Sequence, residues 1–162
     1  MFGFKRKERL YIVSDDFYGQ IDVPKNSEIE RQIRLINLTE RDLRIIHSLK
    51  PYVDQNITEI MSTFYDNLEV ESNLHKIINT NSSAERLKIT LERHISEIFE
   101  GHIDEQYMQK RLQIAHIHLK IGLDTKWYVG SFQILLSFII GVIRENIQSL
   151  DDVVDAIDSV TK

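Results

Sequence analysis

The sequence predicts an all-α protein, and three observations lead to this fold class. Apolar residues recur every three or four positions from about residue 26 onward, which is the spacing of helices that bury one face. Residues that cap helix N-termini stand in front of several of these segments. The chain has 2 Pro and 6 Gly in 162 residues and lacks the strict alternation of strands. We expect an irregular N-terminal segment at 1–24 and one folded domain at 25–162.

Composition excludes several classes of protein. The 25 acidic residues outnumber the 20 basic ones, giving a net charge of −5 and a pI of about 5.7, so a nucleic-acid-binding surface is not expected. The dense basic run Lys5, Arg6, Lys7 and Arg9 is interpreted as a solvated tail. The absence of cysteine excludes disulfides, thiolate catalysis and Cys-ligated zinc or iron–sulfur clusters. The N-terminus lacks the long apolar stretch of a secretion signal, and a cytoplasmic location is expected.

The first half of the folded domain reads as four helices. One is expected at 26–36. Thr39 is expected to cap the next, with Leu38 and Leu43 as its hydrophobic staple. Pro51 is expected to open a separate helix, because the first turn tolerates a missing N–H group. A short helix is predicted at 72–78.

Capping signals divide the second half. Ser82-Ser83-Ala84-Glu85 has the pattern of a capping box, and Gly101 is suited to end the helix that follows it. Asp104 is expected to open the next helix, which Gly122 ends. The side chains of that helix predicted to face inward are Met108, Leu112, Ala115 and Leu119. Asp124 or Thr125 is expected to cap the helix after it.

The helix at 125–147 is apolar around most of its circumference. The stretch from Trp127 to Ile143 carries no charge, but it is shorter than a membrane span of roughly 18 residues or more and contains polar residues, so no membrane span is expected. A helix of this kind is buried on more than one side. We predict a homodimer formed by helices 125–147 and 149–162 of each chain.

The residues assigned to this packing fall into three groups. The core-facing residues are Phe132, Leu135, Leu136 and Ile139, and the partner-facing ones are Ile134, Phe138 and Val142. Val153, Ile157 and Val160 of the final helix are also assigned to the partner, and the small residues Gly130, Ser131, Ser137 and Gly141 are expected to allow close approach. The final helix reaches Lys162 without a C-cap, so we expect it to be cut short and to continue into a longer protein.

The six histidines are the first candidates for chemistry. His116 and His118 lie two positions apart, so on a helix they point to nearly opposite sides and cannot share a metal. His118 has apolar or small neighbours one turn away, which fits either a hydrogen-bonded core histidine or a haem ligand. His94 and Glu97 read as a surface pair. Di-iron, His-Glu-x-x-His, phosphate-loop and nucleophile-elbow motifs are absent, which argues against an ordinary hydrolase or kinase.

Several blocks of the sequence resemble the globin-coupled sensors, and within that family the haem-based aerotaxis transducers. Residues 111–122 and 126–133 are similar to the proximal helix and the helix after it. Residues 64–68 and 87–95 are similar to two distal segments. The similarity runs from about Ile33 to Ser159 with its spacing preserved.

The resemblance implies a globin-like fold with an N-terminal extension helix and a haem-based oxygen sensor rather than an enzyme. It implies haem b held by His118 as the proximal iron ligand, whose other ring nitrogen donates to a carbonyl or hydroxyl. It assigns the stabilisation of O2 to Tyr65 and Thr90. The further pocket residues that it implies are Phe64, Leu87, Ile114, Trp127 and Tyr128. CO and NO are further ligands, and a C-terminal signalling domain, for example for aerotaxis, is the expected partner.

Two alternatives stay open beside this interpretation. A non-haem sensor globin of a stress-signalling complex keeps the fold and the dimer, although it has no need of His118. A haem peroxidase or nitric-oxide dioxygenase requires an electron source, and no flavin or nicotinamide motif is present. The sequence also differs at Asn81 from the best-known transducer of this kind, which has a histidine near the haem edge, so contacts to the haem propionates are left open there.

Overall fold

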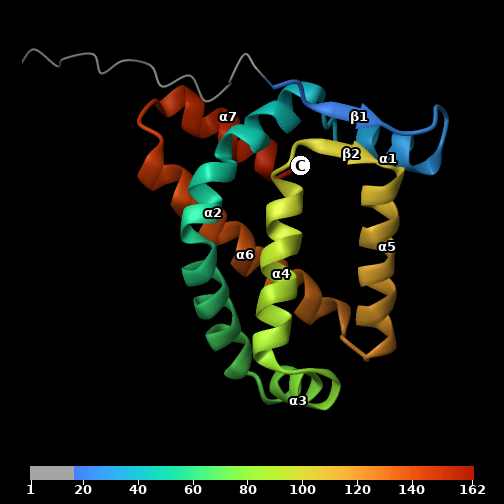
Figure 1. Ribbon diagram of the computed structural model, residues 1–162, viewed down its shortest axis with the longest axis vertical. Helices are drawn as coiled ribbons and strands as arrows, with labels where there is room; N and C mark the ends of the chain where they lie inside the picture. Colours follow the sequence, from blue (N-terminus) through green and yellow to red (C-terminus); the bar gives the residue numbers. More distant parts are fainter. Residues whose placement is uncertain (1–16) are drawn as a thin grey trace, which may run out of the picture.

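The computed structural model describes residues 17–162, and the basic run at 5–9 lies outside them. Seven helices and two short strands form in the described part (Figure 1). In chain order they are β1 (Gln20–Asp22), α1 (Glu28–Leu35), α2 (Glu40–Glu69), α3 (Ser72–Asn81), α4 (Ala84–Ile98), β2 (His102–Asp104), α5 (Glu105–Lys120), α6 (Thr125–Asn146) and α7 (Leu150–Val160). The all-α, globin-like prediction is confirmed.

Helix α2 is the central element, and its continuity corrects one prediction. It runs for 30 residues through Pro51, which does not open a new helix. Pro51 lies on the exposed side, while Leu49 and Val53 beside it are buried. A proline inside a helix costs about 3 kcal/mol, and burial of the apolar residues on both sides of it offsets that cost. Thr39 caps the helix as predicted, in a reciprocal capping box with Asp42.

The core lies along α2, where α4, α6 and α7 pack against it (Figure 1). Its most deeply buried large side chains are Phe99, Ile45, Leu49, Met61, Ile143 and Val53. Helix α5 runs antiparallel to α4 on the far side from α2, and α6 starts near the lower end of α5 and crosses behind α4 in this view. Helix α3 lies at one end of the α4–α5 pair, and the strands lie at the other.

A two-stranded parallel sheet, which the sequence did not predict, joins the N-terminal segment to the domain. Strand β1 pairs with β2 from Gln20 opposite His102 to Asp22 opposite Asp104. The expected irregular segment 1–24 is therefore partly a strand. A side chain at Gly19 would collide with the carbonyl oxygen of Glu40, so only glycine permits this segment to lie against the start of α2.

Helix boundaries follow the predicted signals with small shifts. Ser83, rather than Ser82, is the N-cap of α4 and accepts a hydrogen bond from the Arg86 N–H. Asp104 and Asp124 cap α5 and α6. Gly122 follows α5 with a φ of +74°, a conformation that glycine adopts without strain. Helix α3 extends to Asn81, three residues beyond the expected end.

Several predicted orientations in the last three helices are wrong. Leu112 and Leu119 of α5 are 54% and 76% exposed, because α5 stands apart from α2 and buries none of its residues. In α6, Phe132 is 53% exposed instead of facing the core, and Val142 is buried instead of facing a partner. The other residues assigned to the partner, Ile134, Phe138, Val153, Ile157 and Val160, are partly buried against the core of their own chain. The core-facing side of α6 therefore includes Val142 and excludes Phe132, so it differs from the predicted side by a rotation about the helix axis.

Helix α6 is the one helix within residues 17–162 that is long and apolar enough to cross a membrane. Only 17% of its most apolar window is buried within the chain. Length and composition alone are weak evidence for a membrane span, since apolar helices that pack against other proteins meet the same criteria. Its exposed apolar side chains nevertheless mark α6 as a helix with uncovered surface.

Candidate functional site

His118 lies in the last turn of α5, on the face that α4 and α6 flank. Positions 107, 111, 114 and 118 share this face, because they follow one another at helical spacing. The side chain is half-buried, and burial lowers the pKa of the imidazole below its usual 6.5. A neutral imidazole is the form that ligates a metal, so His118 is in the state that ligation requires.

The surroundings of the His118 ring are aromatic rather than polar. Its centroid is 5.3 Å from that of Tyr128, with the ring planes at 53°. Its Nδ1 atom is buried and has no hydrogen-bond partner among residues 17–162. The expected bond from the second ring nitrogen to a carbonyl or hydroxyl is therefore absent within that range. A buried polar atom without a partner costs free energy and marks a place where another group can bind.

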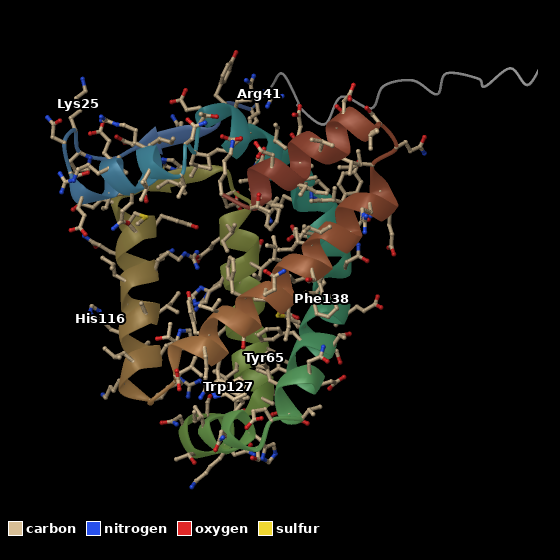
Figure 2. The ribbon with its side chains drawn as sticks, turned by 180° about the vertical axis from the view of Figure 1, so that it is seen from behind. Lys25, Arg41, Tyr65, His116, Trp127 and Phe138 are labelled. Carbon is tan, nitrogen blue, oxygen red and sulfur yellow. The ribbon has the colours of Figure 1, made fainter. Side chains whose placement is uncertain are left out.

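His116 lies on the opposite side of α5, as the two-residue spacing requires, and projects away from α4 and α6 (Figure 2). It borders a shallow surface depression along that outer face. The other residues that line the depression are Gln109, Leu112, Gln113, Ile117 and Lys120. None of them is a predicted site residue, and a metal shared by His116 and His118 is excluded by this geometry.

Tyr65 lies on α2, which faces α4 from the other side. Its side chain is 6% exposed, and burial raises the pKa of its hydroxyl to about 12. The Phe64 ring meets it edge to face at a centroid distance of 5.3 Å. No hydrogen bond from the Tyr65 hydroxyl forms within residues 17–162, so its proton is free to bond a ligand.

The other predicted pocket residues occupy the helices that surround His118 and Tyr65. Leu87 is partly buried and packs against the core, and Ile114 and Trp127 are also partly buried. The Thr90 hydroxyl donates to the Arg86 carbonyl at 2.9 Å, so its proton is engaged within α4. Of the two hydroxyl groups, only that of Tyr65 has no hydrogen-bond partner within residues 17–162. Asn81 likewise donates to a carbonyl of its own helix, that of Ile77.

Four charged or polar residues near this region were not predicted as site residues. The Lys88 ammonium lies 5.9 Å from the centroid of the Tyr65 ring. His94 and Glu97 of α4 approach to 4.0 Å and are 18% and 25% exposed, so they are not the expected surface pair. Arg111 of α5 binds Glu97 at 3.0 Å. Helical spacing could have identified His94, Glu97 and Arg111. His94 and Glu97 follow Thr90 on one face of α4, and Arg111 precedes His118 on one face of α5.

These residues fit a flat apolar cofactor that is ligated by one imidazole. No group of three or more potential metal ligands occurs within residues 17–162, so a metal ion held by several side chains is not supported there. His118 instead provides a single neutral ligand with an unpartnered nitrogen. Leu87, Ile114 and Trp127 add partly buried apolar side chains on the helices around it. The haem implied by the resemblance matches this donor set.

Comparisons with known proteins identify the family. The sequence matches the Protoglobin family over residues 25–162. The haem-based aerotactic transducer HemAT of Halobacterium salinarum is 23% identical over 107 residues, which cover 65% of this chain and 22% of that protein. The chain therefore spans less than a quarter of the length of that relative.

The fold also matches a solved structure. It superposes on the globin domain of the Geobacter sulfurreducens globin-coupled sensor with a TM-score of 0.77 at 20% identity, covering 82% of this chain and 88% of that one. The recognition of a globin-coupled sensor globin domain is confirmed. Since the family match includes most of the sequence, the chain belongs to the Protoglobin family.

Proposed function

We propose that this domain is a haem-based oxygen sensor in which His118 ligates the iron of haem b. The observation that carries the proposal is the His118 imidazole itself, which is half-buried, neutral and unpartnered at Nδ1 within the described residues. In a domain of this family, a side chain with those properties on the pocket face of α5 fits the proximal ligand. When bound, the haem supplies the iron to which a diatomic gas attaches.

On the proximal side, the chain's own residues fix the orientation of the imidazole. Tyr128 packs against the ring at a centroid distance of 5.3 Å and limits its rotation. Ile114 lies one turn before His118 and Trp127 at the start of α6, which makes the surroundings apolar. Apolar walls exclude water and keep His118 neutral.

On the distal side, Tyr65 is the donor that stabilises oxygen. A gas ligand that takes on partial negative charge is bound more tightly when a hydroxyl donates to it, and the Tyr65 proton is uncommitted within residues 17–162. Thr90 acts as the second donor after exchanging its bond to the Arg86 carbonyl. Phe64 and Leu87 provide the apolar walls on this side. CO and NO bind in the same place.

We also propose a homodimer through α6 and α7, coupled to a signalling domain elsewhere in a longer cytoplasmic protein. Val129 and Phe132 of α6 are 58% and 53% exposed. Gly130 and Gly141 have open space where a side chain would be, which permits another helix to approach closely. The uncovered surface of α6 is thus displaced from the predicted residues but remains on the predicted helix.

Haem binding by the purified protein tests the proposal. Titration with haem is expected to give a Soret band that saturates at one haem per chain, and the reduced protein is expected to bind oxygen reversibly. A protein that binds no haem would instead support the non-haem sensor globin. Sustained consumption of nitric oxide in the presence of a reductase would support the enzyme alternative and contradict a purely sensory role.

A further inference from the structure

The hydrogen bonds and ion pairs that join α4 to α5 within residues 17–162 converge on one carboxylate. Glu97 of α4 accepts from Arg111 through Oε2 at 3.0 Å and from Lys110 through Oε1 at 3.3 Å. We call these three residues the Glu97 clamp. Helix α5 buries none of its residues fully, and Tyr107 and Met108 are the α5 residues that pack against the core within the described part of the chain. The clamp adds the polar attachment of α5 to α4.

The clamp lies on the two helix faces that carry the proposed ligand-binding residues. Glu97 follows Thr90 by seven positions on α4, and Arg111 precedes His118 by seven positions on α5. Seven positions are almost two helical turns and about 10 Å of helix length. Because the helices run antiparallel, the clamp lies at the end of the α4–α5 pair nearer to β2 (Figure 1).

The two cations of the clamp are not equivalent. The Arg111 side chain is 22% exposed, whereas that of Lys110 is 47% exposed. Arg111 also lies over the Tyr107 ring, 4.6 Å from its centroid, which fixes the guanidinium in place. Solvent screens an exposed ion pair much more than one that is mostly buried. Arg111 is thus the cation expected to determine the spacing of α4 and α5.

A further contact extends the clamp to His94 on α4. The Nδ1 atom of His94 lies 4.0 Å from Glu97 Oε2, the oxygen that Arg111 binds. His94 Nδ1 and Arg111 Nε are both buried and have no hydrogen-bond partner within residues 17–162. Each unmet bond costs free energy, so the ion pair between Arg111 and Glu97 is the contact that keeps this cluster from costing more.

We propose that Glu97 and Arg111 are positioning residues that set the separation of α4 and α5 and thereby the place of His118 relative to the distal face. The effect on the haem rests on the proposed function, whereas the effect on the spacing of α4 and α5 does not. The clamp does not touch the reacting atoms and acts through the helix that carries His118. Removing Arg111 leaves the Glu97 carboxylate without its buried partner and releases α5.

The first experiment measures the helix spacing without haem. The chain has no cysteine, so spin labels placed at Arg93→Cys and Gln113→Cys, both on exposed positions, report the distance between α4 and α5 by electron double resonance. Arg111→Met is expected to lengthen and broaden the distance distribution. Lys110→Met, the matched control, is expected to leave it unchanged, and the charge swap Glu97→Arg with Arg111→Glu to restore it.

The second experiment measures the consequence in the haem-loaded protein. Arg111→Met is expected to increase the rate of haem transfer to an apoglobin acceptor by about tenfold and to shift the iron–histidine stretching band. Lys110→Met is expected to change neither. If Arg111→Met does not fold, Glu97→Gln provides the milder test of the same contact, with the same expected direction.

The outcomes separate the clamp from the proposed function. An unchanged distance distribution in Arg111→Met, or equal effects of Arg111→Met and Lys110→Met, overturns the clamp. An altered spacing with an unmoved iron–histidine band reduces Arg111 to a structural role and overturns the positioning of His118. A wild-type protein that binds no haem contradicts the proposed function, while the spin-label distances still decide on the clamp.

Discussion

Replacing Tyr65 by Phe isolates the contribution of one hydroxyl to oxygen binding. The ring is 6% exposed and packs edge to face against Phe64, and Phe retains both the ring and its packing. The Tyr65 hydroxyl forms no hydrogen bond within residues 17–162, so none is lost in the protein without ligand. We therefore expect the free energy of unfolding to change by less than about 0.5 kcal/mol.

The effect on ligand binding is expected to be larger and selective. A hydrogen bond contributes about 1 kcal/mol net, and 1.4 kcal/mol corresponds to a factor of ten. Loss of the Tyr65 donor is therefore expected to speed oxygen dissociation about fivefold. Carbon monoxide carries less negative charge when bound, so its dissociation is expected to change less.

Stopped-flow measurement of both dissociation rates checks this prediction. Tyr52→Phe is the matched control, because Tyr52 is partly buried on the same helix nearer to its other end. It is expected to leave both rates unchanged. Equal acceleration for the two gases in Tyr65→Phe would show that Tyr65 acts through packing, and an unchanged oxygen rate would refute the assigned hydrogen bond.

Three further substitutions test stability and assembly. Burial by itself raises the pKa of Asp42, but hydrogen bonds from Lys162 and Thr39 more than offset this and lower the pKa below 3.8. The ionised carboxylate thus stabilises the fold above about pH 4, and that contribution is lost as the pH falls through the lowered pKa. In urea unfolding, Asp42→Asn is expected to cost about 2 kcal/mol at pH 7 and progressively less toward pH 3, while a cost independent of pH would contradict this. Pro51→Ala restores a helical N–H on an exposed position and is expected to stabilise the protein by about 2 kcal/mol; a lower melting temperature would show that α2 requires the proline. Phe132→Glu is expected to reduce the mass in sedimentation equilibrium to 19.1 kDa from twice that value, and a wild-type mass of 19.1 kDa would exclude the dimer.

The sequence predicted the helices well because local signals specify them. Thr39, Asp104 and Asp124 each cap the helix that follows, and Gly122 ends α5 as expected. These features depend on backbone groups within one turn, so they are readable without the fold. Pro51 was misread because its local preference for a helix start was overcome by burial of its neighbours, which only the tertiary structure reveals.

The orientation of the helices about their axes was less predictable. Helix α6 is apolar on nearly every side, so the pattern could not choose between Phe132 and Val142 as the core-facing residue. The Glu97 clamp was missed for a related reason. Glu97 and Arg111 lie on two different helices. From the sequence alone a charged residue is assigned to the surface, because the helix that packs opposite it is not known. The assignment of His118 as a haem ligand came from a family resemblance rather than from spacing, and it stays a prediction.

Haem titration of the wild type beside His118→Ala tests whether His118 holds the haem. Burial favours the neutral His118 imidazole, and no described residue occupies its Nδ1. If His118 is the ligand, the wild type is expected to give a saturating Soret band at one haem per chain. His118→Ala is expected to retain haem more weakly, and added imidazole is expected to restore the spectrum. A wild type that binds no haem, or a His118→Ala variant that binds haem as tightly and with the same reduced spectrum, would contradict ligation by His118.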